Sequence, residues 1–134
     1  MSELPNVFFP GWVDKIKLEA LGKMSIASLA PYKNTEDFIL SIPNKIVDAL
    51  SLSLPILSPL QGEVAKLIEE NEVGFTYNDD FLLGDFINTL IKDVKLREKI
   101  SNNANKLYES EFEFNMVYNE LVCHLENIVL KKIT

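Results

Sequence analysis

Two short apolar runs decide the fold of this chain: residues 25–32 read SIASLAPY, and residues 54–58 read LPILS. Both lack the polar–apolar alternation of a strand that has one solvent-exposed face. Prolines follow or interrupt both runs. Wholly apolar strands are buried on both faces, as in a parallel sheet covered by helices. Between them, residues 41–50 have apolar positions at helical spacing. Strand, helix and strand in this order predict a parallel β-α-β unit.

The same alternation extends in both directions from this unit. Residues 6–12 (NVFFPGW) and residues 74–77 (GFTY) are read as two further strands. Helices are predicted after Asp14 and after Gly62, and residues 78–80 (NDD) as a turn and helix cap. We therefore predict an α/β domain with a Rossmann-like parallel sheet of about four strands, in which residues 25–31 and 54–57 are central.

The second part of the chain changes character. Residues 81–86, 86–94, 95–108 and 114–133 have apolar residues at helical spacing, which predicts a helical C-terminal end. The whole of residues 1–134 is interpreted as one domain, with strand–helix alternation over residues 1–78 and helices over residues 79–134.

Composition excludes several functional classes. The chain has 134 residues, is 47% hydrophobic and carries a formal net charge of −7, which disfavours general nucleic-acid binding. The single cysteine, Cys123, rules out an internal disulfide and offers no zinc-site spacing, so no metal site is predicted. No apolar run reaches the ~20 residues of a membrane span, and no signal peptide is recognised. A cytoplasmic protein without a transmembrane segment is the simplest expectation.

The segment SIPNKIVDAL, residues 41–50, holds the candidate binding site. Ser41 is predicted to cap a helix with Pro43 in its first turn, where free N–H groups attract anions. Lys45 adds positive charge there, and Asn44 and Asp48 share a helix face. A phosphate at the helix tip and a ribose diol on Asp48 would suit a nucleoside diphosphate. The plainer interpretation is a capped helix with a solvated Lys45–Asp48 ion pair, and the segment alone favours it.

The order of short motifs along the chain resembles family 4 glycosyltransferases, whose GT-B fold has two facing Rossmann-like domains. These motifs read Gly11-Trp12-Val13, Pro31-Tyr32, Asp48-Ala49-Leu50, Leu54-Pro55-Ile56-Leu57, Gly62-Glu63 and Gly74-Phe75-Thr76-Tyr77. Each motif is weak by itself, but their common order and spacing make a stronger signal. The lead-in SIPNK is similar to the subgroup that builds bacterial surface polysaccharides, and the resemblance covers nearly all of residues 6–134.

The resemblance implies the C-terminal, donor-binding domain of a hexosyltransferase that uses a UDP- or GDP-sugar and a saccharide or lipid-linked acceptor. By analogy, Asp48 would hold the ribose, Ser41 and nearby N–H groups the phosphates, and Glu63 the sugar or ribose. Glu63 at a helix start also fits simple dipole complementarity. The family's donor-sugar glutamate would fall at Leu40, which cannot replace it. Glu36 or Asp37 is then either a substitute or a solvated loop charge.

Several parts of that family's catalytic unit are not recognised in the sequence. We find no glycine-rich phosphate loop, no arginine and lysine that grip the diphosphate, and no acceptor domain. The expectation is a fragment without transferase activity of its own, whose catalytic residues stay unknown. The parent enzyme would be peripheral at the inner membrane face. The fragment is expected to self-associate through an open sheet edge and a bare last helix.

Two alternatives remain open at this point. One is a non-catalytic flavodoxin-like module that binds a partner or regulates; the other is a nucleotide-sugar epimerase of the same two-domain architecture. His124 lies in a predicted helix far from every strand end and is interpreted as structural or exposed. Trp12 and Tyr32 end strands and could stack on a base, although aromatic packing is the commoner role.

Overall fold

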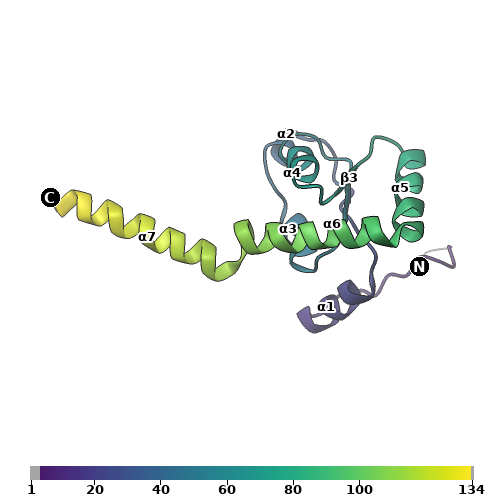
Figure 1. Ribbon diagram of the computed structural model, residues 1–134, viewed down its shortest axis with the longest axis horizontal. Coiled ribbons are helices and arrows are strands. Elements are labelled where there is room, and N and C mark those ends of the chain that lie inside the picture. The colour runs from purple at the N-terminus through teal and green to yellow at the C-terminus, as the bar shows by residue number, and fades with distance from the viewer. Residues whose placement is uncertain (1–3, 134) are drawn as a thin grey trace.

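The computed structural model describes residues 4–133 and has a small parallel sheet surrounded by helices (Figure 1). The strands β1 (Ser28–Leu29), β2 (Ile56–Ser58) and β3 (Gly74–Thr76) lie in the order β1-β2-β3. Ser28 pairs with Ile56, and Leu57 pairs with Phe75, both in parallel register. The helices are α1 (Lys15–Met24), α2 (Glu36–Ile39), α3 (Asn44–Ser51), α4 (Glu63–Asn71), α5 (Asp80–Lys92), α6 (Val94–Leu107), the π-helical turn η1 (Tyr108–Phe112) and α7 (Phe114–Ile133).

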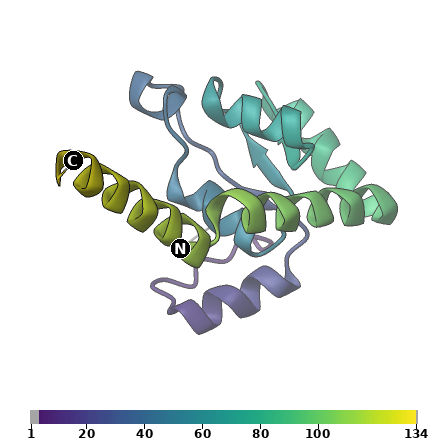
Figure 2. The same cartoon turned by 60° about the vertical axis from the view of Figure 1, so that its left-hand side comes forward.

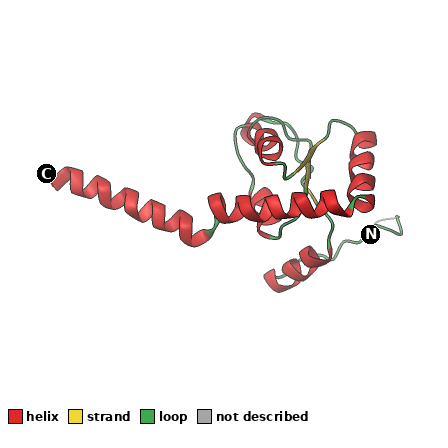
Figure 3. Cartoon of the chain, in the orientation of Figure 1, coloured by secondary structure: helices red, strands yellow, loops and turns green. Residues whose placement is uncertain are grey.

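The α/β class and the parallel pairing are as predicted, but the sheet of residues 4–133 has three strands instead of about four. The predicted strand at residues 6–12 is an exposed coil, drawn as loop in Figure 3, in which Phe8 is 84% and Trp12 91% exposed. A short strand forms only where a neighbour takes up its N–H and C=O groups, and no strand of the described chain lies beside this one. Residues 54–57 are therefore central, as predicted, whereas β1 is an edge strand.

Helix caps explain where two of the predicted helices begin. The Asp14 carboxylate accepts a hydrogen bond from the Lys17 N–H at 2.8 Å and starts α1. The Asp79 carboxylate accepts one from the Leu82 N–H at 2.7 Å and starts α5. Each satisfies one of the N–H groups that a helix start leaves without an acceptor. The short helix α2 begins at Glu36, inside residues 33–37, whose polar sequence indicates a loop.

Adjacent residues of β2 point into two hydrophobic clusters on opposite faces of the sheet. Ile56 belongs to a cluster shared with α3, α4 and the end of α6, including Leu50 and Ile68. Leu57 belongs to a second cluster with Tyr77, Leu90 of α5 and Ile100 of α6. Both faces of the central strand are thus buried, which is the environment that its unbroken apolar sequence indicates.

Tyr77 gives the second cluster a measurable pH dependence. Burial of its phenol, together with the negative charge of Asp80, raises the pKa of Tyr77 above its ordinary value. Just above about pH 10 only the unfolded chain loses this proton, so the free energy of unfolding should fall as the pH rises. We expect urea unfolding at about pH 9 and about pH 11 to show a smaller loss of stability in Tyr77→Phe than in the parent chain. An equal loss in both proteins would contradict the assignment.

Candidate functional site: the groove between α1 and α3

The helix that carries most candidate residues starts differently from the prediction. Pro43 occupies the N-cap position of α3, not its first turn, and no side chain caps the helix. The Ser41 hydroxyl instead donates a hydrogen bond to the Asp37 carbonyl oxygen at 2.6 Å. Ser41 is therefore not the cap of α3, because Pro43 takes the N-cap position and Ser41 lies two residues before it. The first N–H groups of α3 are left without a side-chain acceptor, which is the condition for attracting an anion.

Lys45 and Asp48 lie together in a groove beside the open edge of the sheet. The groove between α1 and α3 has a cavity volume of about 280 Å³ and is lined by Leu18 and Leu21 of α1, by residues 27–29, and by Lys45 and Asp48. Of the described residues that line it, Lys45 and Asp48 are the ionisable ones. Ligand pockets usually have roughly 300–1,000 Å³, with apolar walls and few polar groups. The groove has the same kind of lining, mostly apolar with few charged groups, and its volume is slightly below this range.

The solvated ion pair that the plainer interpretation predicted is not formed. Both Lys45 and Asp48 are exposed, yet no ion pair joins them in the described part of the chain. One helical turn separates them along α3, at about 1.5 Å of rise per residue. Their charges are therefore free to act on a third partner in the groove.

Asn44 and Ser41, the other candidates of this segment, do not line the groove. Both are exposed, Ser41 before α3 and Asn44 as its first residue. The possible substitutes for the missing sugar-binding glutamate, Glu36 and Asp37, are exposed in the first turn of α2 and do not line it either. Their position is that of ordinary dipole-complementary charges at a helix start.

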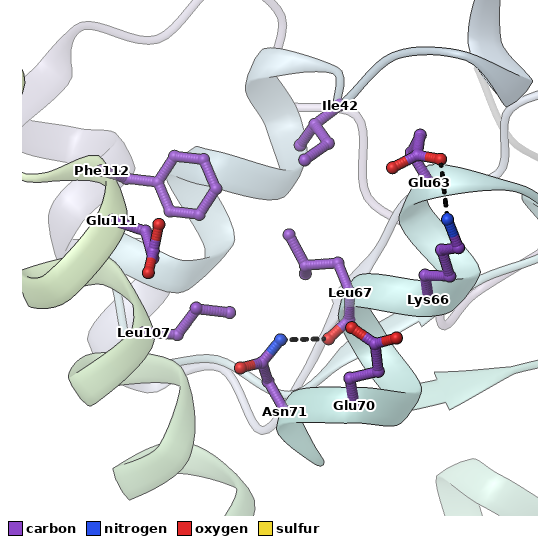
Figure 4. A pocket seen from close by; sticks show the side chains of 9 residues that line it. All are labelled: Ile42, Glu63, Lys66, Leu67, Glu70, Asn71, Leu107, Glu111 and Phe112. Carbon is purple, nitrogen blue, oxygen red and sulfur yellow. Dashed lines mark hydrogen bonds and ion pairs between the residues drawn. The ribbon is translucent and has the colours of Figure 1, made fainter.

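Glu63 lies on a different cavity, shown in Figure 4. This cavity, of about 460 Å³, is lined by α4, by Ile42 and by the chain around η1. The Glu63 carboxylate contacts the ammonium of Lys66 at 3.3 Å. Glu70 and Glu111 line the same cavity, so its walls carry three carboxylates against one ammonium. Such a cavity repels a diphosphate, and the structure does not bring Glu63 together with Lys45 and Asp48.

Sequence reasoning missed the residue that holds the two loops at the carboxyl end of the sheet. The Asn34 amide donates to the Pro59 carbonyl oxygen at 2.9 Å and accepts from the Gln61 N–H at 2.7 Å. Buried Ser58 adds a second tie, since its hydroxyl donates to the Ala30 carbonyl oxygen at 2.9 Å. These bonds join the chain after β1 to the end of β2 and the loop that follows it. The only signal in the sequence was an asparagine in a polar loop after a strand.

The remaining singled-out residues have simple environments. The Tyr32 ring packs against Phe38 with 4.7 Å between centroids, so the packing interpretation holds for Tyr32. Trp12 does not pack, as its exposure shows. His124 is exposed on α7, as expected. Residues 4–133 contain no cluster of histidine, cysteine, aspartate and glutamate side chains that could hold a metal ion.

Comparison of the chain with protein-family models, with curated proteins and with solved structures finds no match. Across the described helices, none has both the length and the apolar character needed to cross a membrane.

Proposed function

We propose that this chain is the donor-binding part of a glycosyltransferase that moves a hexosyl group from a nucleoside diphosphate carrier. The acceptor would be a saccharide or a lipid-linked sugar in cell-surface polysaccharide synthesis. The observation that supports this proposal best is that Lys45 and Asp48 line the same groove at the sheet edge. The order of the sequence motifs supports it independently.

The groove holds chemical groups that would suit the parts of a nucleotide. Lys45 is nearer the start of α3, where N–H groups and the helix dipole favour phosphate. Asp48 lies one turn further along, where a carboxylate accepts hydrogen bonds from both hydroxyls of a ribose. Leu18, Leu21 and Leu54 supply apolar surface for a base. The phosphates would thus lie near Lys45, the ribose near Asp48 and the base against the leucines of the groove.

Catalysis in such an enzyme consists mainly of positioning and of stabilising the charge that develops on the leaving diphosphate. Lys45 is the candidate for that charge stabilisation within this chain. An acceptor-binding surface and a catalytic base would come from other parts of the enzyme. We therefore expect the purified chain to bind a nucleoside diphosphate weakly and to transfer no sugar by itself.

Replacing Asp48 by asparagine tests the proposal. An asparagine side chain offers one acceptor oxygen and a mismatched donor to the ribose diol. Losing a charge-assisted hydrogen bond costs about 1.5–3 kcal/mol, or roughly a ten- to hundredfold rise in the dissociation constant. Calorimetric titration of uridine and guanosine diphosphates into the parent chain and into Asp48→Asn measures this change.

The matched control is Asp85→Asn, the same change at an exposed position of α5 away from the groove. It should leave the dissociation constant within about twofold, as expected for an exposed, uninvolved charge. Equal affinities for Asp48→Asn and Asp85→Asn, with both variants folded by circular dichroism, would refute the ribose assignment. Absence of any nucleoside diphosphate binding by the parent would favour the non-catalytic module instead.

A further inference from the structure

The last helix carries a long apolar face that nothing in residues 4–133 covers. In Figures 1 and 2, α7 leaves the body after η1 and projects into open space. Its apolar side chains are about half exposed: Tyr118 by 52%, Leu121 by 49% and Leu125 by 52%. An apolar patch of this kind on a monomer usually marks an interaction site.

The spacing of this face suits pairing with another helix. Phe114, Tyr118, Leu121, Leu125 and Ile128 follow one another at alternating steps of four and three residues. Alternating steps of this kind give the average repeat of 3.5 residues that forms the seam of a coiled coil. We call these five residues the α7 seam. The 20 residues of α7 extend for about 30 Å, enough for several layers of contact.

The charges at the two ends of α7 identify the occupant. Glu111 and Glu113 lie directly before the helix, and Lys131 and Lys132 lie in its last turn. In an antiparallel pair centred on Leu121, each acidic end meets the basic end of the partner. A parallel pair would instead place like charges together. A surface that complements itself in this way is what a two-fold symmetric dimer requires.

We propose that the α7 seam binds the α7 seam of a second copy of this chain, in antiparallel orientation. Phe114 lies seven residues before Leu121 and Ile128 seven residues after it, so these two residues meet across the pair. Tyr118 meets Leu125 next to the symmetry axis. The antiparallel arrangement also aligns the positive end of each helix dipole with the negative end of the other.

A lipid surface is a poorer occupant because helices that lie on membranes have polar faces rich in lysine and arginine. The polar positions of α7 include Glu120 and Glu126, and its two lysines are confined to one end. An anionic membrane would attract only that end. The protein partner is therefore the better match for the whole length of the helix.

Light scattering and sedimentation across the micromolar range test the pairing. The parent chain should have the mass of two chains, and Leu121→Glu should have the mass of one. Asn119→Glu, which adds the same charge on the opposite side of α7, should remain a dimer. A monomeric parent, or a Leu121→Glu variant that still dimerises, would overturn the proposal. So would a parent that stays monomeric and binds vesicles of anionic phospholipid.

Cross-linking tests the orientation. In a Cys123→Ser background, the single variants Phe114→Cys and Ile128→Cys are mixed and oxidised, and the products are identified by mass spectrometry. The antiparallel pair predicts disulfides between Phe114→Cys and Ile128→Cys chains. Disulfides formed only between identical variants would show a parallel pair and would overturn the proposal. Leu121→Glu should bind a nucleoside diphosphate as the parent chain does, because the α7 seam lies outside the groove. A failure of the dimer can therefore be distinguished from a failure of the donor site.

Discussion

Gly74→Ala is expected to destabilise the protein by about 3 kcal/mol or more, the upper end of the cost of overpacking. A Cβ at position 74 would lie 1.9 Å from the Ile56 carbonyl oxygen and 2.6 Å from the Ile56 nitrogen. These are backbone atoms of β2, so they cannot move aside without separating β2 from β3. A glycine within a strand often marks such a close approach of two backbones.

Urea unfolding followed by circular dichroism measures this loss, and Gly84→Ala is its control. Gly84 lies inside α5, and a Cβ there would have no neighbour within 4 Å. Alanine should therefore raise the free energy of unfolding by up to about 1 kcal/mol through its helix propensity. If both variants change stability in the same direction, the close approach of Gly74 to β2 is not what makes this position sensitive.

The second large effect is expected for Gly62→Ala, at the start of α4. Gly62 has a φ of 70° and a ψ of −131°, a conformation that side chains rarely adopt. A Cβ would also lie 2.2 Å from the Ile39 carbonyl oxygen. Strain and overlap together should lower the free energy of unfolding by about 2–4 kcal/mol. The overlap would displace α2 and, with it, the approach to α3 and the groove.

Gly11→Ala separates backbone strain from overlap of the added Cβ. Gly11 also has a positive φ, of 72°, but a Cβ there meets nothing within 4 Å. Its coil can relax, so its unfolding free energy should stay within the ±0.5 kcal/mol typical of surface changes. A Gly62→Ala variant with parent-like stability would mean that the loop after β2 does not hold α2 in place. Hydrogen exchange of residues 36–43 would report the displacement directly.

Much of the fold could be predicted because it depends on local patterns. The runs at residues 25–32, 54–58 and 74–77 contain β1, β2 and β3. The aspartate caps at Asp14 and Asp79 began their helices as expected. A run at residues 6–12 with the same apolar character did not form a strand, because pairing requires a neighbour and composition does not supply one.

The candidate site was predictable only in part, for the same reason. Lys45 and Asp48 share a groove because helix periodicity puts residues three apart on neighbouring positions. The resemblance implies that Glu63, in the motif Gly62-Glu63, contacts the same donor as Asp48. Helix α4 instead directs its carboxylate to Lys66 and to a cavity near η1. Distances between elements depend on how the loops pack, and Asn34 and Gly62 set that packing.

By itself, the sequence determined the strand and helix periods, the negative charge, and the apolar face of α7. These properties follow from residue type and spacing, which act within one element. Only the tertiary structure decided which strand lies at the edge of the sheet, that Ser41 bonds to Asp37 instead of capping α3, and that the face of α7 stays bare. The edge position of a strand and the uncovered face of α7 depend on elements distant in the sequence, whereas the bond from Ser41 to Asp37 depends on how the chain between α2 and α3 folds. The free energy of a contact exists only once the chain has brought both partners together.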